Sequence, residues 1–112
     1  MRIAVPVANH QLCMHFGHCE VFTFFDVDEK NKTITFKKDV TPPPHEPGLL
    51  PKWIGEQGAN LVLAGGMGQR AQSLFTQNGV KVIVGVAENN PEQAVLDYLN
   101  NKLTTGSNSC DH

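Results

Sequence analysis

The sequence predicts an α/β fold in which flanking helices cover a mixed five-stranded sheet, in the order β-β-β-α-β-α-β-α. Three observations predict it: short apolar runs around Ile3, Leu61 and Val82, two alternating segments joined by a polar turn, and helical periodicity between the later strands. With 112 residues and a mass of 12.3 kDa, the chain has room for one core. We expect a single domain over residues 1–103 and a flexible polar tail over residues 104–112.

The first half of the chain is expected to supply three strands. Residues 3–7 are an apolar run typical of a buried strand, and residues 8–20 form a long loop without periodicity. Residues 21–28 and 33–38 are rich in Phe, Val, Thr and Ile, so we expect them to pair as a hairpin through the polar residues between them. Four of the seven prolines lie in residues 41–47, which predicts a stiff, extended connector.

The second half alternates helices with two further buried strands, expected over residues 61–64 and 80–86. Pro51 suits the first turn of a helix that ends at Gly58, and Asn90 is a typical N-cap for the last helix. The helices carry apolar side chains at helical spacing: Leu50, Trp53 and Ile54; Ala71, Leu74 and Phe75; Ala94, Val95, Tyr98 and Leu99. The three buried strands should be parallel neighbours, and the hairpin should extend the sheet to one edge.

Composition narrows the range of functions. Nine basic and eleven acidic residues give a net charge of −2, which argues against a nucleic-acid partner. The N-terminal apolar stretch is interrupted at Pro6 and is too short for a signal peptide or a membrane span, so we expect a cytoplasmic protein with no membrane partner. Three cysteines are an odd number, and in a reducing compartment they are more typical of ligands, reactive groups or buried apolar residues than of disulfides.

Soft metal donors gather in one short stretch after the first strand. It holds His10, Cys13, His15, His18 and Cys19, which are two of the three cysteines and three of the five histidines. Thiolate and imidazole are the donors that copper(I), zinc and iron–sulfur units prefer. The remaining donors lie elsewhere in the chain: His45, Cys110 and His112. The clustering favours metal contact, although a buried cysteine is also a common apolar filler and the two cysteines of this stretch could pair as a redox disulfide.

A glycine-rich turn, Gly65-Gly66-Met67-Gly68, lies between the second buried strand and the helix that follows. Glycine lets backbone N–H groups approach a ligand, and a helix N-terminus carries partial positive charge, so the turn is a candidate anion site to which Arg70 adds a full charge. The pattern matches neither of the glycine motifs that bind nucleotides. The alternative is a tight turn that needs left-handed backbone angles. If the stretch of soft donors and the turn bind one ligand, that ligand is both anionic and soft, which describes a sulfur-bridged metal cluster or a thiomolybdate.

Catalytic motifs are missing from the sequence. It contains neither G-x-S-x-G nor H-E-x-x-H, and most acidic residues fall in expected turns or helix starts, where solvation or capping explains them. No carboxylate pair for general acid–base catalysis is evident. We therefore expect a binding protein, not an enzyme.

Five segments together resemble the dinitrogenase iron–molybdenum cofactor biosynthesis family, which includes NifX-like domains and the C-terminal domains of NifB-type proteins. They are residues 3–7, 15–17, 44–48, 65–68 and 110–112, and the similarity covers essentially the whole chain. The resemblance implies a ribonuclease H-like fold without the nuclease carboxylates, and binding or delivery of molybdenum- or iron-containing sulfur clusters. One branch, the orange protein of sulfate reducers, is similar and holds a mixed molybdenum–copper sulfide cluster.

The resemblance also implies site residues, position by position. Several residues match family positions: His15, Gly17, His45, the glycine turn, Cys110 and His112. Many members have Arg after Phe-Gly, where this chain has His18 followed by Cys19. The departure replaces a cation by two soft donors, which favours direct metal ligation and leaves the type of cluster open.

The leading hypothesis is a non-enzymatic carrier or scaffold for a metal–sulfur cluster (Fe–S, Mo–Fe–S or Mo–Cu–S) that serves cofactor assembly. The expected metal ligands are Cys13, His15, His18, Cys19, His45, Cys110 and His112; the expected cradle is Gly17, Gly65, Gly66, Met67, Gly68 and Arg70. These groups should meet at the carboxyl ends of the parallel strands. Two alternatives remain open: a mononuclear zinc or copper site, and a regulatory module for a nucleotide-binding cluster-assembly ATPase. Cluster-assembly proteins are the expected partners.

Overall fold

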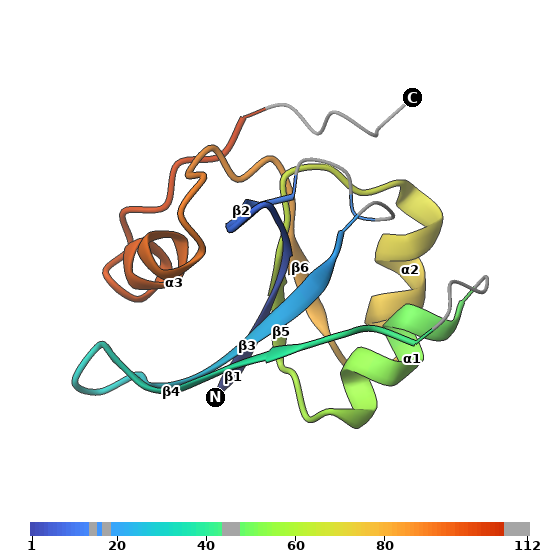
Figure 1. Ribbon diagram of the computed structural model, residues 1–112, viewed down its shortest axis with the longest axis horizontal. Coiled ribbons are helices and arrows are strands. Elements are labelled where there is room, and N and C mark those ends of the chain that lie inside the picture. The colour runs from blue at the N-terminus through green and yellow to red at the C-terminus, as the bar shows by residue number, and fades with distance from the viewer. Residues whose placement is uncertain (14–15, 17–18, 44–47, 107–112) are drawn as a thin grey trace.

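The computed structural model of the chain describes residues 1–13, 16, 19–43 and 48–106. They form a six-stranded mixed sheet with helices on both faces (Figure 1). The elements in chain order are β1 (Arg2–Ala8), β2 (Gln11–Leu12), β3 (Val21–Asp28), β4 (Thr33–Val40), α1 (Leu49–Glu56), β5 (Leu61–Leu63), α2 (Gln69–Gln77), β6 (Lys81–Ile83) and α3 (Pro91–Leu99). The strand order is β4-β3-β1-β5-β6, and β2 pairs with β1. Because β1, β5 and β6 are parallel and the β3–β4 hairpin reaches one edge, the predicted arrangement of strands is confirmed. The ribonuclease H-like assignment stays a prediction.

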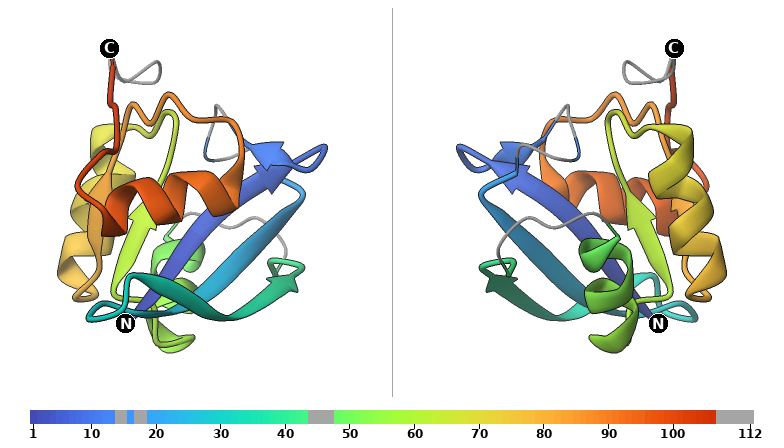
Figure 2. Two further views of the ribbon diagram at one scale, coloured as in Figure 1. Left: turned by 90° about the vertical axis from the view of Figure 1, so that its left-hand side faces the viewer. Right: turned by 90° about the vertical axis from the view of Figure 1, so that its right-hand side faces the viewer.

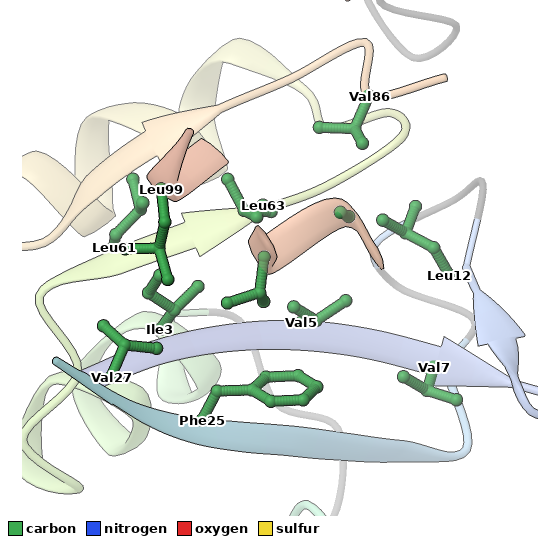
Figure 3. Close-up of a cluster of buried hydrophobic side chains, with 12 residues drawn as sticks. Ile3, Val5, Val7, Leu12, Phe25, Val27, Leu61, Leu63, Val86 and Leu99 are labelled. Atoms are coloured by element: carbon green, nitrogen blue, oxygen red, sulfur yellow. The ribbon is translucent and has the colours of Figure 1, made fainter. Parts of the chain in front are cut away.

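The central strand β1 divides the core into two layers. Its alternating side chains Ile3, Val5 and Val7 belong to the apolar cluster on the α3 side, which Figure 3 shows, whereas Ala4 belongs to the cluster under α1 and α2. Figure 2 shows α3 in front of the sheet in one view and α1 with α2 in front in the other. Both faces are covered, so β1 reads as a continuous apolar run, as strands buried on both faces do.

The hairpin follows the sequence pattern closely. β3 has the predicted bounds, and β4 runs two residues past the predicted end. The carboxylate of Asp28 accepts hydrogen bonds from the N–H groups of Lys30 (3.0 Å) and Asn31 (3.1 Å), which closes the polar turn between the strands. β4 is the edge strand and is mostly exposed, with Lys37 and Lys38 on it, and charged side chains on an edge strand discourage pairing with another chain.

The expectation of a loop over residues 8–20 and of five strands is wrong, because β2 lies inside this segment. Asn9 (φ 53°) and His10 (φ 65°) both have left-handed backbone angles, so they form a two-residue hairpin turn that returns the chain alongside β1. Glycine is the usual residue at the second position of such a turn. This turn contains no glycine, so the sequence lacks the signal that predicts such a hairpin.

The last strand is shorter and less buried than residues 80–86 suggest. β6 lies at the edge of the sheet, with Lys81 exposed and its two other residues half-buried. Val84 and Val86 lie beyond the end of β6 on either side of Gly85 (φ +74°), and they pack against opposite core clusters. The three helices agree with prediction: Asn90, for example, caps α3 by accepting the N–H of Gln93 at 3.1 Å. Among the residues that the structure describes, none forms a helix long and apolar enough to cross a bilayer.

Candidate functional site

The carboxyl ends of the parallel strands β1 and β5 lie at one edge of the sheet, toward the top of Figure 1. Three segments that are far apart in the sequence meet at this edge: the stretch after β2, the glycine turn between β5 and α2, and the stretch after β6. Open α/β sheets place ligand sites at the carboxyl ends of their strands. We therefore expect the predicted donors to lie at this edge.

The two N-terminal cysteines are both held against the end of β1. The N–H of Cys13 donates to the carbonyl of Pro6 across 2.8 Å, and the N–H of Glu20 donates to the carbonyl of Val7 across 2.9 Å. The stretch that carries Cys13 and Cys19 thus leaves and rejoins the sheet at adjacent residues. Cys13 is buried, with 7% of its surface exposed, and Cys19 is half-buried. Neither thiol projects freely into solvent.

The protonation of Cys19 reflects this environment. The pKa of its thiol is raised from 9.0 to about 11, first by burial and second by the nearby Cys13 thiol, because two thiolates close together repel each other. Cys19 therefore holds its proton at neutral pH in the metal-free protein. A soft cation that displaces the proton would stabilise the thiolate that the protein alone disfavours.

We expect iodoacetamide to alkylate Cys19 at pH 8 roughly a hundredfold more slowly in the folded, metal-free protein than in the urea-unfolded chain. A pKa of about 11 in place of 9.0 leaves about a hundredth of the thiolate. Between these two values the unfolded chain has lost the proton and the native chain retains it, so stability should fall as pH rises through this window. Mass spectrometry of the Cys19 peptide measures the rate, and equal rates in the two states would contradict the raised pKa.

Phe16 connects the cysteine stretch to the glycine turn. Its N–H donates to the carbonyl of Gly66 across 3.1 Å. Its ring is 8% exposed and packs edge-on against Phe22 of β3 and Phe75 of α2, with ring centroids 5.7 and 5.4 Å apart. The expectation that the cysteine stretch and the glycine turn lie on the same side of the sheet is thus confirmed for the described residues.

The glycine turn leads directly into α2. Gly65, Gly66 and Met67 are buried, and Gly68 is the N-cap of the helix. Gly68 has φ −66°, and a Cβ there would meet no atom within 4 Å, so a left-handed backbone is not the reason for glycine at this position. No side chain in the described part of the chain caps the first turn, and Arg70 is exposed within it. The helix start therefore offers free N–H donors and a cation, the pair that an anion requires.

A second series of backbone hydrogen bonds joins the glycine turn to the start of the predicted tail. The N–H of Gly85 donates to the carbonyl of Gly65 (2.8 Å), and the N–H of Gly106 donates to the carbonyl of Gly85 (2.6 Å). The N–H of Ala87 also donates to the carbonyl of Thr104 (3.1 Å). A Cβ on Gly85 would overlap the carbonyl oxygen of Gly106, so this close approach requires glycine. Residues 104–106 are therefore fixed beside the candidate site.

His10 lies apart from the two thiols. It is exposed in the β1–β2 turn and lines a cavity of about 200 Å³ together with Val7, Asp39 and Glu92. Val7 belongs to the core cluster on the α3 side, so His10 lies on the opposite face from the aromatic residues around Phe16. The donor cluster seen in the sequence therefore includes one histidine, His10, that the fold places elsewhere.

The described residues bring together part of the predicted site: Cys13, Cys19, the glycine turn and Arg70. The side chain of Met67 is 1% exposed and packs in the core under α1 and α2, and its carbonyl accepts a hydrogen bond from Gln72 Nε2 across 2.9 Å. Six predicted residues lie outside the described residues: His15, Gly17, His18, His45, Cys110 and His112. Within the described ranges, no three His, Cys, Asp or Glu side chains are grouped to hold a metal ion, so the thiol pair is the donor set that these ranges supply.

Sequence reasoning missed two structural contributions to this edge. The ring of Phe16 was not given a role of its own, although a large aromatic side chain in a loop is a signal of anchoring. The contact between Gly85 and Gly106 was also missed. The interruption of an apolar run by Gly85 hinted at a close backbone approach, but nothing in the sequence identifies the residue that approaches it.

The sequence matches the family described as dinitrogenase iron-molybdenum cofactor over residues 1–101. The uncharacterized protein MJ0580 of Methanocaldococcus jannaschii is 33% identical over 86 residues, which cover 73% of this chain and 72% of that protein. The crystal structure of PH0822 has a TM-score of 0.86 at 30% identity and covers 94% of each chain. The apo orange protein from Desulfovibrio gigas has a TM-score of 0.71 at 21% identity, over 96% of this chain and 93% of that chain, which shows a shared fold.

Proposed function

This chain belongs to the dinitrogenase iron–molybdenum cofactor family, and on that premise we propose that it is a non-enzymatic cytoplasmic carrier of an anionic metal–sulfur cluster. The proposed cargo contains iron, molybdenum with iron, or molybdenum with copper, bridged by sulfide. One observation carries the proposal: the hydrogen bond from Phe16 N–H to the Gly66 carbonyl (3.1 Å) brings the stretch between Cys13 and Cys19 to the glycine turn, which leads into an uncapped helix. Cluster-assembly proteins are the proposed partners.

Each proposed role follows from the chemistry of the group. Cys13 and Cys19 would supply thiolates, which bind soft metal ions through sulfur. The first N–H groups of α2 would donate hydrogen bonds to cluster sulfides, and Arg70 would neutralise part of their charge. Further ligands are proposed outside the described residues: His15, His18, His45, Cys110 and His112. Gly17, Gly65, Gly66, Met67 and Gly68 would provide the backbone cradle.

The partial burial of the thiol pair suits a carrier. Cys13 is buried against β1, which gives a fixed attachment point, whereas Cys19 is half-buried and keeps access to solvent. A cluster attached at such an edge can be taken up from one protein and passed to another without unfolding the core. The raised pKa of Cys19 adds a further property, because release of the cluster would be assisted by protonation of the thiolate left behind.

Anaerobic reconstitution tests the proposal directly. The metal-free protein is incubated with iron and sulfide, with tetrathiomolybdate, or with tetrathiomolybdate and copper(I), then desalted and analysed for metal, acid-labile sulfide and visible absorption. We expect one of these mixtures to leave a coloured protein in which metal and sulfide are both retained in fixed ratio.

Other outcomes point to the alternatives. Zinc or copper retained without acid-labile sulfide would replace the cluster by a mononuclear site and would contradict the carrier proposal. Failure to retain any metal, together with binding to a nucleotide-dependent assembly ATPase, would make the chain a regulatory module instead.

A further inference from the structure

Phe16 occupies a central place between the two halves of the candidate site. It lies in the stretch between Cys13 and Cys19, and its backbone and ring make contacts in different directions. The backbone N–H donates to the glycine turn, and the ring enters the core between β3 and α2. The residue is buried although it lies in a loop, with 8% of its surface exposed. A side chain that stabilised only the loop would not need to be buried in the core.

The two ring contacts lead to the elements that hold the site. Phe75 belongs to α2, the helix that the glycine turn begins, so contact with its ring fixes the cysteine stretch relative to that turn. Phe22 pairs with Pro6 in the sheet, and the carbonyl of Pro6 accepts the N–H of Cys13. The ring of Phe16 therefore contacts two side chains next to the site. Phe22 lies opposite Pro6, which binds the N–H of Cys13, and Phe75 belongs to the helix that follows the glycine turn.

From these contacts we infer that Phe16 is a positioning residue, whose ring holds the Cys13–Cys19 stretch against the glycine turn so that thiols and N–H donors face a common ligand. The inference rests on the proposed function for the identity of that ligand, but the positioning itself is a property of the metal-free protein. The two ends of the stretch are bound to β1 through the N–H groups of Cys13 and Glu20. Removal of the ring would leave the hydrogen bond from Phe16 N–H to the Gly66 carbonyl without the aromatic packing that supports it.

The test compares Phe16→Ala with Phe24→Ala in the metal-free protein. Phe24 is a matched control because it is 4% exposed, lies in the same core cluster and packs edge-on against Trp53 at 5.8 Å, away from the cysteine stretch. At equal fraction folded, we expect Cys13 and Cys19 of Phe16→Ala to be alkylated roughly tenfold faster than in wild type, because loss of two aromatic contacts favours local opening. Phe24→Ala should keep the wild-type rates at both thiols.

A second pair of variants controls for the possibility that the alanine variants unfold. Phe16→Leu and Phe24→Leu keep an apolar side chain, and Phe16→Leu should give a smaller acceleration of the same two thiols while its control gives none. Equal alkylation rates in the Phe16 and Phe24 variants would overturn the inference, because a merely structural phenylalanine destabilises the fold without selecting these two cysteines.

Titration with Co²⁺, whose thiolate complexes absorb through charge transfer, separates the inference from the proposed function. If wild type shows the thiolate band and Phe16→Leu needs roughly tenfold more Co²⁺ to reach it, positioning acts on ligand binding. If wild type shows no thiolate band, the proposed function loses its thiol ligands, while the alkylation comparison still decides the role of Phe16.

Discussion

Replacing Cys13 and Cys19 together by Ser should lower the affinity of the protein for a copper(I) or iron–sulfide cargo by more than roughly a hundredfold. Changes to groups that only orient metal ligands already cost up to about that factor, and here the thiolates themselves are removed. Both residues lie at the end of β1, where a serine hydroxyl offers a harder and weaker donor. Metal and sulfide retained after anaerobic desalting measure the loss.

His10→Ala is the matched control for this double substitution. His10 is a soft donor from the same stretch of sequence, but it lies on the α3 side with Val7 and Asp39. The His10 variant should keep the wild-type metal content. If the cysteine variant retained as much cluster as His10→Ala, the thiols would not be ligands, and the carrier proposal would lose its main chemical support.

Gly85→Ala should both destabilise the protein and release residues 104–106 from the candidate site. An alanine at φ +74° costs roughly 1 kcal/mol from the backbone alone. Its Cβ would also overlap the carbonyl oxygen of Gly106, and forced overlap in a packed region costs roughly a further 1–3 kcal/mol. Urea denaturation measures the stability, and hydrogen exchange at the amides of Ala87 and Gly106 reports the release.

Gly79→Ala separates the two costs. Gly79 has φ +75°, nearly the same as Gly85, but a Cβ there would have no atom within 4 Å. This control should therefore show the backbone cost alone, with the amides of Ala87 and Gly106 still protected. If the two variants lost equal stability and kept equal protection, the contact between Gly85 and Gly106 would not hold the segment in place.

Much of the fold could be predicted because the local patterns were strong. The Phe- and Val-rich run of β3 is bounded by polar residues, and its predicted and observed ends coincide. Two features had no local signal. β2 depends on a hairpin turn through Asn9 and His10, neither of which is glycine, and β6 is shorter than predicted, with Gly85 beyond its end in contact with Gly106. The hairpin of β1 and β2 pairs neighbouring residues but lacks the glycine that marks such turns, whereas the contact between Gly85 and Gly106 joins residues far apart in the sequence, which hydrophobic periodicity does not record.

The candidate site could be predicted in outline only. The rule that ligands lie at the carboxyl ends of parallel strands predicted that the cysteine stretch and the glycine turn meet, and the Phe16–Gly66 hydrogen bond confirms their contact. Closeness in the sequence gives no side-chain direction, so His10 was counted in the donor cluster, although not among the expected ligands. It also does not reveal that Phe16 packs between β3 and α2, because that contact depends on the neighbouring elements in three dimensions.

The frame of this edge consists of main-chain hydrogen bonds: Cys13 to Pro6, Phe16 to Gly66, Gly85 to Gly65 and Gly106 to Gly85. Amide and carbonyl groups are the same whatever side chain a residue carries, so exchange of a donor leaves these bonds in place. Selectivity for one metal over another can consequently diverge among descendants of one ancestor while the architecture persists. The same independence makes the edge a suitable scaffold for laboratory redesign, in which donor types are varied one position at a time.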